Sequence, residues 1–521
     1  VKQKLRAVPN KGLSYGAIKY LAPDSTETNR VKTHRHYNLA FNYLGRFQEM
    51  KSDKSMFEPV EDLVVPQKGD KETDYIPGNV SLSHAGDTLL LQVAVPTWLY
   101  SSDEVIRLGR SWCEWMNRIV DHCLDTTTIG GRTLSDVPLL GSASVVEDVE
   151  TELLSGLKLR PLDIEDVYPV TPLQSGLLTA MISDPAEYVL QSVFDIRGDF
   201  DFERLETCWK SLALETPLLR TVFVSTVHGL FQAVTNEDLS EWIMLPATWL
   251  SDEIDTLTKE YLDNDRQRGF TLMSKSYHRF AAARISDGRI RVFWTHHHSL
   301  MDGWSLQLVM DKLLSICYGE EYNATFVPFK DHIEWLAQQD EEPSRLFWES
   351  ALANSDQSQQ LALPKPHLDG QTSQTKYKAL ALTVPLPGMT SVCRKLGVTP
   401  SSVFRAAWSI VLQQYTRSEY VTFGSVVSGR DTGLDGVDKI IGMLINTVPI
   451  QVHVSTGGLT DDLIVDVHRL STDIVQYSHC SLVDVKRWAK VAPEGQLFDT
   501  ILVYENYPPS EMDKSKLRPF T

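Results

Sequence analysis

The sequence lacks any apolar run near the roughly 20 residues needed to cross a bilayer, and no secretory signal peptide opens it. We therefore expect no membrane partner. A basic excess is missing too: the 521 residues carry a formal net charge of −18, whereas binding to phosphate groups requires a positive face. This charge argues against a nucleic-acid groove, so we expect no nucleic-acid partner.

Cysteine is scarce, and no two cysteines form the close CxxC pair that zinc and redox motifs use. Scattered cysteines favour buried free thiols over disulfides, which suits the reducing cytoplasm, where we expect the protein to reside. The six are Cys113, Cys123, Cys208, Cys317, Cys393 and Cys480.

The rest of the composition is that of an ordinary globular protein, with 42% hydrophobic and 23% charged residues. The polar runs 51–78 and 125–132 predict a loop and a linker. Apolar residues recur at helical spacing in several segments that alternate with strand-like runs, which predicts a mixed α/β architecture. These helical segments are 103–123, 145–157, 173–183, 202–214 and 401–415.

The most specific feature is a run of three histidines followed by Asp-Gly, at 295–305. It lies between a strand-like segment, 289–294, and an amphipathic helix that begins at 306. Side chains alternate between the faces of a strand, so His297 points away from His296 and His298 if the strand continues to His298. One face is expected to be buried and the other to face a cleft. Because histidine exchanges protons near neutral pH, the run predicts proton-handling chemistry.

Metal binding is an alternative use of neighbouring histidines. His296 and His298 share a face, but the run lacks the two or more further ligands that a stable zinc site requires. We expect no metal here, and we interpret His296 as a neighbour of the reacting group without a defined role.

Residues 295–305 match the HHxxxDG signature, and the chain resembles the condensation domains of nonribosomal peptide synthetases and their acyltransferase relatives. One short motif would be a weak signal, but further segments resemble the other motifs of this family and follow in the family's order. They lie at 166–176, 219–223, 427–430, 441–449, 479–484 and 502–507.

The resemblance implies a two-lobed α/β fold like that of chloramphenicol acetyltransferase, with an additional partial lobe at the N-terminus. The condensation domain is expected at 163–521, with lobes at about 163–335 and about 336–521, the second truncated at its end. Segments 6–16 and 41–45 resemble late motifs of an epimerisation domain, so residues 1–125 are expected to be the C-terminal part of such a domain, without its histidines and its activity. Residues 126–162 resemble the interdomain linker with its short helix.

The resemblance also implies a role for each motif residue. His298 acts at the reaction centre and His297 is structural. Asp302 forms a buried ion pair, with Arg430 as its first and Arg220 as its second candidate partner. Gly303 offers its N–H to an oxyanion or is a plain turn glycine. The substrate tunnel is expected to include Trp304, Ser305, Ser428 and Asn446.

The implied reaction is amide formation, in which an acceptor aminoacyl amine attacks a donor aminoacyl or peptidyl thioester. The substrates arrive on phosphopantetheine arms of upstream donor and downstream acceptor carrier domains, and no cofactor is bound directly. The chain contains no carrier attachment motif and no adenylation signature, so those partners lie elsewhere. The epimerisation-like segment favours a D-configured donor and an L acceptor. The alternatives are an epimerisation-type domain, which Gly303-Trp304-Ser305 disfavours, and a silent carrier-docking scaffold.

Overall fold

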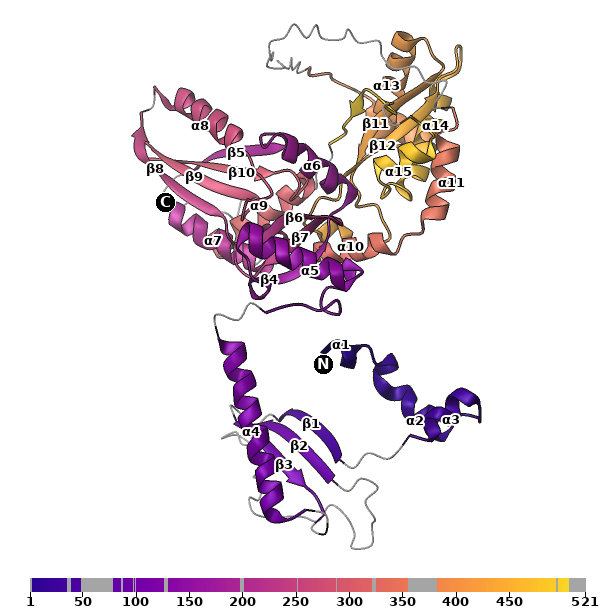
Figure 1. Cartoon of the computed structure of the whole chain (residues 1–521). Helices are drawn as coiled ribbons and strands as arrows, with labels where there is room; N and C mark the ends of the chain where they lie inside the picture. Colours follow the sequence, from indigo (N-terminus) through magenta and orange to yellow (C-terminus); the bar gives the residue numbers. More distant parts are fainter. Residues whose placement is uncertain are drawn as a thin grey trace, which may run out of the picture. The chain divides into compact units, whose positions relative to one another are not determined.

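Figure 1 shows the computed structural model of the chain. The chain divides into two compact units, Val1–Gly130 and Gly131–Thr521, and each is described by itself. Three parts of the sequence lie wholly or partly outside the described residues. They are the predicted loop 51–78, the predicted linker 125–132, and residues 506–521, which include the end of the last motif. The structure describes residues 2–34, 39–47, 78–85, 88–96, 98, 100–125, 130–196, 201–250, 252–286, 288–320, 325–354, 382–492 and 495–505.

The first unit combines a small sheet with helices. The sheet has the order β1-β2-β3, in which β1 runs parallel and β3 antiparallel to β2. The helix predicted at 103–123 is confirmed as α4, which begins where the Ser101 hydroxyl accepts the Glu104 N–H. The elements are α1 (Lys2–Arg6), η1 (Pro9–Gly12), α2 (Leu13–Tyr20), α3 (Thr26–Lys32), β1 (Leu39–Phe47), β2 (Gly78–Ala85), β3 (Thr88–Ala94) and α4 (Ser102–Leu124).

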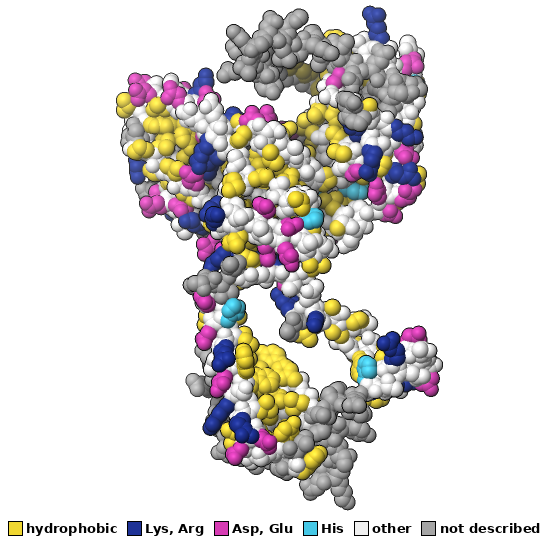
Figure 2. Space-filling model, viewed as in Figure 1, with side chains coloured by type: hydrophobic (Ala, Val, Ile, Leu, Met, Phe, Trp, Pro, Cys, Tyr) yellow, Lys and Arg dark blue, Asp and Glu magenta, His cyan; other side chains and the backbone are white. Residues whose placement is uncertain are grey.

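The apolar stripe of α4 is more exposed than its helical spacing predicts. Trp112 stacks on Phe41 with 5.5 Å between ring centroids, whereas Trp115 is 59% exposed. Figure 2 shows apolar side chains gathered on this unit. Cys113 and Cys123 are also exposed on this helix, so the expectation of buried thiols is wrong for these two and confirmed for the other four, all of them free.

In the second unit, the N-terminal lobe packs helices on both faces of a four-stranded sheet of order β5-β10-β9-β8 (Figure 1). Trp294 contacts Trp209 of α7, whereas its neighbour Phe293 lies against Tyr261 of α8. The strands are β4 (Ile164–Pro169), β5 (Val189–Ile196), β6 (Thr221–Thr226), β7 (Gly229–Thr235), β8 (Glu241–Trp249), β9 (His278–Ile285) and β10 (Ile290–His297). The helices are α6 (Pro172–Ser183), α7 (Phe202–Glu215), η5 (Pro217–Arg220), α8 (Ile254–Arg268), α9 (Gly303–Tyr318) and α10 (Phe329–Ala337).

Residues 131–162, which we predicted as linker, pack into this lobe. They form η2 (Pro138–Leu140), α5 (Ala143–Glu152), η3 (Leu153–Leu157) and η4 (Pro161–Asp163). Val149 and Leu153 belong to the main core and are almost fully buried, because the apolar side of α5 lies against β6 of the sheet β4-β7-β6. The segment therefore contributes to the stability of the second unit.

The C-terminal lobe has a core of its own around the sheet β12-β11-β13. One of its segments leaves that core: Val437, Ile440, Ile441 and Leu444 are buried in the core of the N-terminal lobe. We call residues 437–444 the crossing segment. The elements are α11 (Glu341–Ala351), α12 (Met389–Leu396), α13 (Pro400–Thr416), β11 (Tyr420–Val427), η6 (Val437–Lys439), β12 (Asn446–His453), α14 (Thr460–Val475), α15 (Leu482–Trp488) and β13 (Ile501–Leu502). Among the described residues, no helix has the length and apolarity to cross a membrane.

Candidate functional site

The three histidines lie at the end of β10, between β5 and β9. The strand ends at His297, one residue earlier than the alternation argument assumed, because the chain turns and the Leu300 N–H donates to the His297 carbonyl at 3.1 Å. The predicted alternation holds within the strand. The ring of His296 lies by Trp294, at 4.9 Å between centroids, whereas the ring of His297 faces Phe270 and Tyr277.

His298 is the only one of the three histidines that is not buried. Its backbone N–H donates to the Tyr188 carbonyl at 2.9 Å, and its ring Nδ1 lies 3.1 Å from the Met301 carbonyl oxygen. A carbonyl only accepts hydrogen bonds, so Nδ1 carries the proton. When the ring is neutral, the other nitrogen, Nε2, has a free lone pair, which is the arrangement that a general base requires.

His297 and His296 are held neutral. Burial, and then the neighbouring His298, lower the pKa of His297 to about 4, and its Nδ1 lies 2.8 Å from the Ser299 hydroxyl. Burial lowers the pKa of His296 to about 3. Neither ring is accessible to a substrate. His298 is therefore the only ring of the three that a substrate can reach.

Asp302 and Arg430 form the ion pair that the motifs predict. The two guanidinium NH groups donate to both carboxylate oxygens at 2.7 and 3.0 Å, and the side chains are 0% and 3% exposed. Asp302 also accepts the Ser305 N–H at 2.9 Å, as the N-cap of α9, and the Leu444 N–H at 3.1 Å. With its oxygens engaged in this way, Asp302 joins the two lobes and is no candidate for the base.

Arg220, the second candidate partner, does not contact Asp302. It pairs instead with Glu165 at 2.8 Å and donates to the Ala213 carbonyl at the end of α7. Gly303 is the first residue of α9, where the first backbone N–H groups of a helix have no partner within the helix. This position suits an oxyanion donor.

The four predicted tunnel residues fall into two groups. Ser305 is fully buried, and its hydroxyl bonds to Arg430 and to the Gly442 backbone, so its assignment to the tunnel wall is corrected: it ties the lobes together. Trp304 also ties the two lobes together, since its indole N–H donates to the Asp438 carbonyl at 3.0 Å. Ser428 bonds to Asp431, and only Asn446 lines a described pocket.

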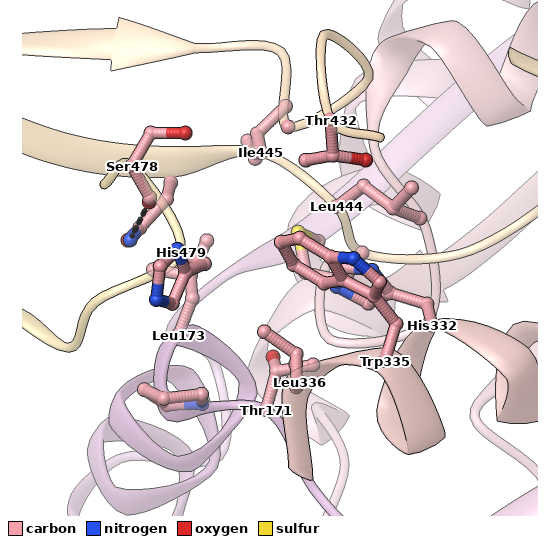
Figure 3. A pocket seen from close by; sticks show the side chains of 14 residues that line it. Thr171, Leu173, His332, Trp335, Leu336, Thr432, Leu444, Ile445, Ser478 and His479 are labelled. Carbon is pink, nitrogen blue, oxygen red and sulfur yellow. Dashed lines mark hydrogen bonds between the residues drawn. The ribbon is translucent and has the colours of Figure 1, made fainter. Parts of the chain in front are cut away.

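That pocket lies between the lobes and encloses about 390 Å³ including its open mouth (Figure 3). Neither His298 nor the ion pair lines it, but Gly429, which precedes Arg430, and Leu444, which donates to Asp302, both do. Its lining residues are Thr171, Pro172, Leu173, His332, Trp335, Leu336, Gly429, Thr432, Met443, Leu444, Ile445, Asn446, Ser478 and His479.

Two residues that position the site were not singled out from the sequence. The buried Gln174 side chain accepts the Thr171 N–H and donates to the Ser299 carbonyl at 2.9 Å, which joins the start of α6 to the histidine turn. Tyr188 supplies the carbonyl for His298 from a left-handed backbone conformation with φ 55°. The motif at 166–176 contains Gln174, so a signal existed for it, but no local pattern marks Tyr188.

The sequence is similar to proteins of a known family. Residues 164–520 match the condensation domain family. The chain is 28% identical to one of the linear gramicidin synthase polypeptides of Brevibacillus parabrevis, over 99% of this chain and 7% of the relative. It is 29% identical to bacitracin synthase 3 of Bacillus licheniformis, over 98% and 8% respectively. The chain therefore spans only a small part of these relatives.

Solved structures show the fold. The crystal structure of holo T3CT superposes with a TM-score of 0.55 at 21% identity, covering 69% of this chain and 79% of that one. The first condensation domain of the calcium-dependent antibiotic synthetase, in complex with a substrate analogue, gives 0.51 at 19% identity, covering 67% and 83%. The expected two-lobed fold is confirmed. By sequence match and by fold, the chain belongs to the condensation domain family of the nonribosomal peptide synthetases.

Proposed function

We propose that the chain forms an amide bond between two tethered substrates, with His298 as the group that handles the proton. The observation that carries this proposal is the Met301 carbonyl beside Nδ1, which leaves Nε2 of a partly exposed imidazole as the acceptor. Nothing else in the histidine run combines access with a free lone pair, because His296 and His297 are buried.

In the proposed reaction, the acceptor amine attacks the thioester carbon, so a C–N bond forms and the carbonyl oxygen becomes an oxyanion. The Gly303 N–H stabilises that charge. An α-amino group has a pKa near 8, so roughly a tenth is already neutral at pH 7. Nε2 of His298 therefore takes the proton from the charged adduct and returns it to the sulfur as the C–S bond breaks.

The substrates in this proposal are thioesters on the phosphopantetheine arms of carrier domains, an upstream donor and a downstream acceptor. Adenylation domains that load these carriers are further partners. This follows from the family and from the relatives, which are much larger synthases. A four-domain nonribosomal peptide synthetase shares the fold with a TM-score of 0.55 at 16% identity.

The first unit supports a finer proposal, in which residues 1–125 are the end of an epimerisation-type domain and the donor is D-configured. The match to the linear gramicidin synthase polypeptide covers 99% of this chain, so it extends over this unit, and the unit is compact in itself. Coupling of one acceptor with D- and L-aminoacyl donor carriers tests this. We expect the D donor to react faster, and equal rates would refute the assignment.

The decisive test of the condensation proposal is His298→Ala, assayed with both carriers loaded. We expect the rate to fall by about 10²–10⁴-fold, the usual contribution of a general acid–base group. His453→Ala is the matched control, since His453 is a half-exposed surface histidine near Glu419. Full activity of His298→Ala would exclude the proposal. Epimerised product without coupling would favour the epimerisation alternative, and carrier binding without either would favour a scaffold.

A further inference from the structure

The pocket between the lobes carries no charge. None of its lining residues is Asp, Glu, Lys or Arg. Burial, and then the neighbouring Arg430, lower the pKa of His332 to about 4, and burial lowers the pKa of His479, so the imidazoles in its wall are neutral at neutral pH. An ionised ligand group would lose its hydration without gaining a counter-charge, so the pocket favours an uncharged one.

Three polar atoms in this wall are buried without a hydrogen bond to any described residue. They are Nδ1 of His332, a residue that is 5% exposed, Nδ1 of His479 and the Thr432 hydroxyl. Buried polar groups are nearly always satisfied, because leaving one unpaired is costly. All three residues line the same pocket, which indicates a ligand with a hydrogen-bonding group.

The body of the pocket is apolar and aromatic. The Trp335 indole lies between two imidazoles in Figure 3, stacked on His332 at 5.9 Å and edge-on to His479 at 5.5 Å between centroids. Leu173, Leu336 and Leu444 complete the wall. This combination suits a flat or branched side chain with one polar group.

The pocket is linked to the reaction centre through the ion pair. The Leu444 and Ile445 N–H groups both donate to the Asp302 carboxylate, at 3.1 and 3.4 Å. Asp302 follows His298 by four residues, which span at most about 14 Å when extended. The pocket wall is therefore fixed to the loop that carries the reacting histidine.

We propose that this pocket receives the side chain of one aminoacyl substrate and selects an uncharged side chain that bears a hydrogen-bonding group, such as a phenol or a carboxamide. This rests on the proposed function, since the side chain belongs to a tethered aminoacyl group. His332 and Thr432 bond to the polar group, and Trp335 packs on the apolar part.

The first experiment measures binding, which does not depend on catalysis. The probes are non-reactive pantetheine amides of tyrosine and phenylalanine, and of asparagine and leucine, titrated into the full chain by calorimetry. We expect the polar member of at least one pair to bind tenfold or more tightly, because a site built for a hydrogen bond rejects the analogue that lacks it. Thr432→Val replaces the hydroxyl with a methyl group of similar size and is expected to abolish this preference.

Thr500→Val is the matched control, because the Thr500 hydroxyl is also buried without a described partner and lies outside the pocket. It should keep the wild-type preference. Wild-type protein without any preference would overturn the proposal. An equal loss of affinity for all four probes in Thr432→Val would also overturn it. That result would indicate that the pocket holds the pantetheine arm, which all four probes share.

Coupling assays with the same side chains, first on the donor and then on the acceptor carrier, identify which substrate uses the pocket. The preference should appear in kcat/KM for one of the two arms and not the other. Selective binding without any coupled product would refute the proposed function and leave the pocket assignment standing. Coupling that ignores the side chain on both arms would overturn the pocket assignment alone.

Discussion

Two backbone carbonyls hold His298 in place, one from Met301 in its own turn and one from Tyr188, which directly precedes the neighbouring strand β5. The second comes from a residue in the left-handed region, which is sterically unfavourable for a bulky side chain. Such conformations persist where the surrounding structure imposes them, and they concentrate at functional sites. The backbone at Tyr188 is therefore part of the arrangement that fixes the backbone of His298.

We predict that Tyr188→Gly leaves stability near that of the wild type, whereas Tyr188→Val lowers it by about 1–2 kcal/mol, because only glycine adopts the left-handed conformation without strain. Neither variant has the phenol ring, so a difference between them reports the backbone. The valine variant should also couple substrates more slowly, as its carbonyl shifts away from His298. Thermal unfolding and coupling rates check both effects. Equal behaviour of the two variants would contradict this role.

The buried neutral histidines predict sensitivity to acid. His297 has a pKa of about 4 in the folded state, lowered by burial, against about 6.5 when unfolded. As the pH falls from 6.5 to 4, the unfolded chain binds a proton that the folded chain does not, so the stability of the protein falls. Below pH 4, both states carry this proton and His297 no longer changes the stability. His296 and His332 act in the same direction.

Between pH 7 and pH 5, we expect the free energy of unfolding to fall by roughly 2 kcal/mol less in His297→Gln than in the wild type. Urea unfolding midpoints at the two pH values measure the difference. His453→Gln, which changes a half-exposed histidine, should behave like the wild type. If His297→Gln and the wild type lose the same amount, His297 is not buried as a neutral ring.

At the scale of the elements, the crossing segment depends on a glycine. Gly442 lies so close to Phe329 of α10 that a Cβ atom there would overlap the phenyl ring. Its carbonyl and N–H both bond to the Ser305 hydroxyl, at 2.9 Å each. A shift of this backbone would therefore disturb the start of α9 and the ion pair beside it.

We predict that Gly442→Ala destabilises the second unit by about 1–3 kcal/mol, the usual cost of overpacking a core, and lowers the coupling rate. Gly433→Ala is the control, because nothing lies within 4 Å of a Cβ at that position and its φ is not positive. Calorimetric unfolding of both variants provides the comparison. A Gly442→Ala protein as stable as Gly433→Ala would show that the contact relaxes without cost.

Local sequence patterns predicted the positions of helices better than they predicted which face of each helix is buried. The predicted helices at 173–183 and 202–214 are confirmed as α6 and α7. On α13, Val411 lies at the apolar spacing of the predicted helix but is 37% exposed, whereas Ser402 and Ser409 are buried. These small polar residues are buried because α13 packs closely on α14, where the Ser402 hydroxyl lies 3.0 Å from the His468 ring. Close packing of two helices leaves no mark in the apolar periodicity.

Sequence patterns likewise predicted some parts of the candidate site and not others. His297, His298, Asp302 and Arg430 were found because a motif joins residue type to spacing. Tyr188 and the interlobe pocket were not, since the pocket takes its wall from separate segments of both lobes and only the folded chain brings them together. The positions of Ser305 and Trp304 in the lobe contact also depend on a segment far along the chain.

At the scale of the whole molecule, the second compact unit begins at Gly131, ahead of the family match at 164. We predict that a protein starting at residue 131 unfolds at a higher temperature than one starting at residue 163, because the latter lacks α5 and the buried Val149 and Leu153. Removing such side chains from a core costs about 2–5 kcal/mol each. Equal melting temperatures would show that α5 adds nothing to the unit.

The crossing segment has a consequence for protein engineering. Because residues 437–444 belong by sequence to one lobe and by packing to the other, a chimaera that exchanges the C-terminal lobe at about residue 336 would insert a foreign peptide into the host's interior. Grafts that retain the host's own 437–444 together with Phe329 and Ser305 should be better tolerated than grafts cut at the apparent lobe boundary.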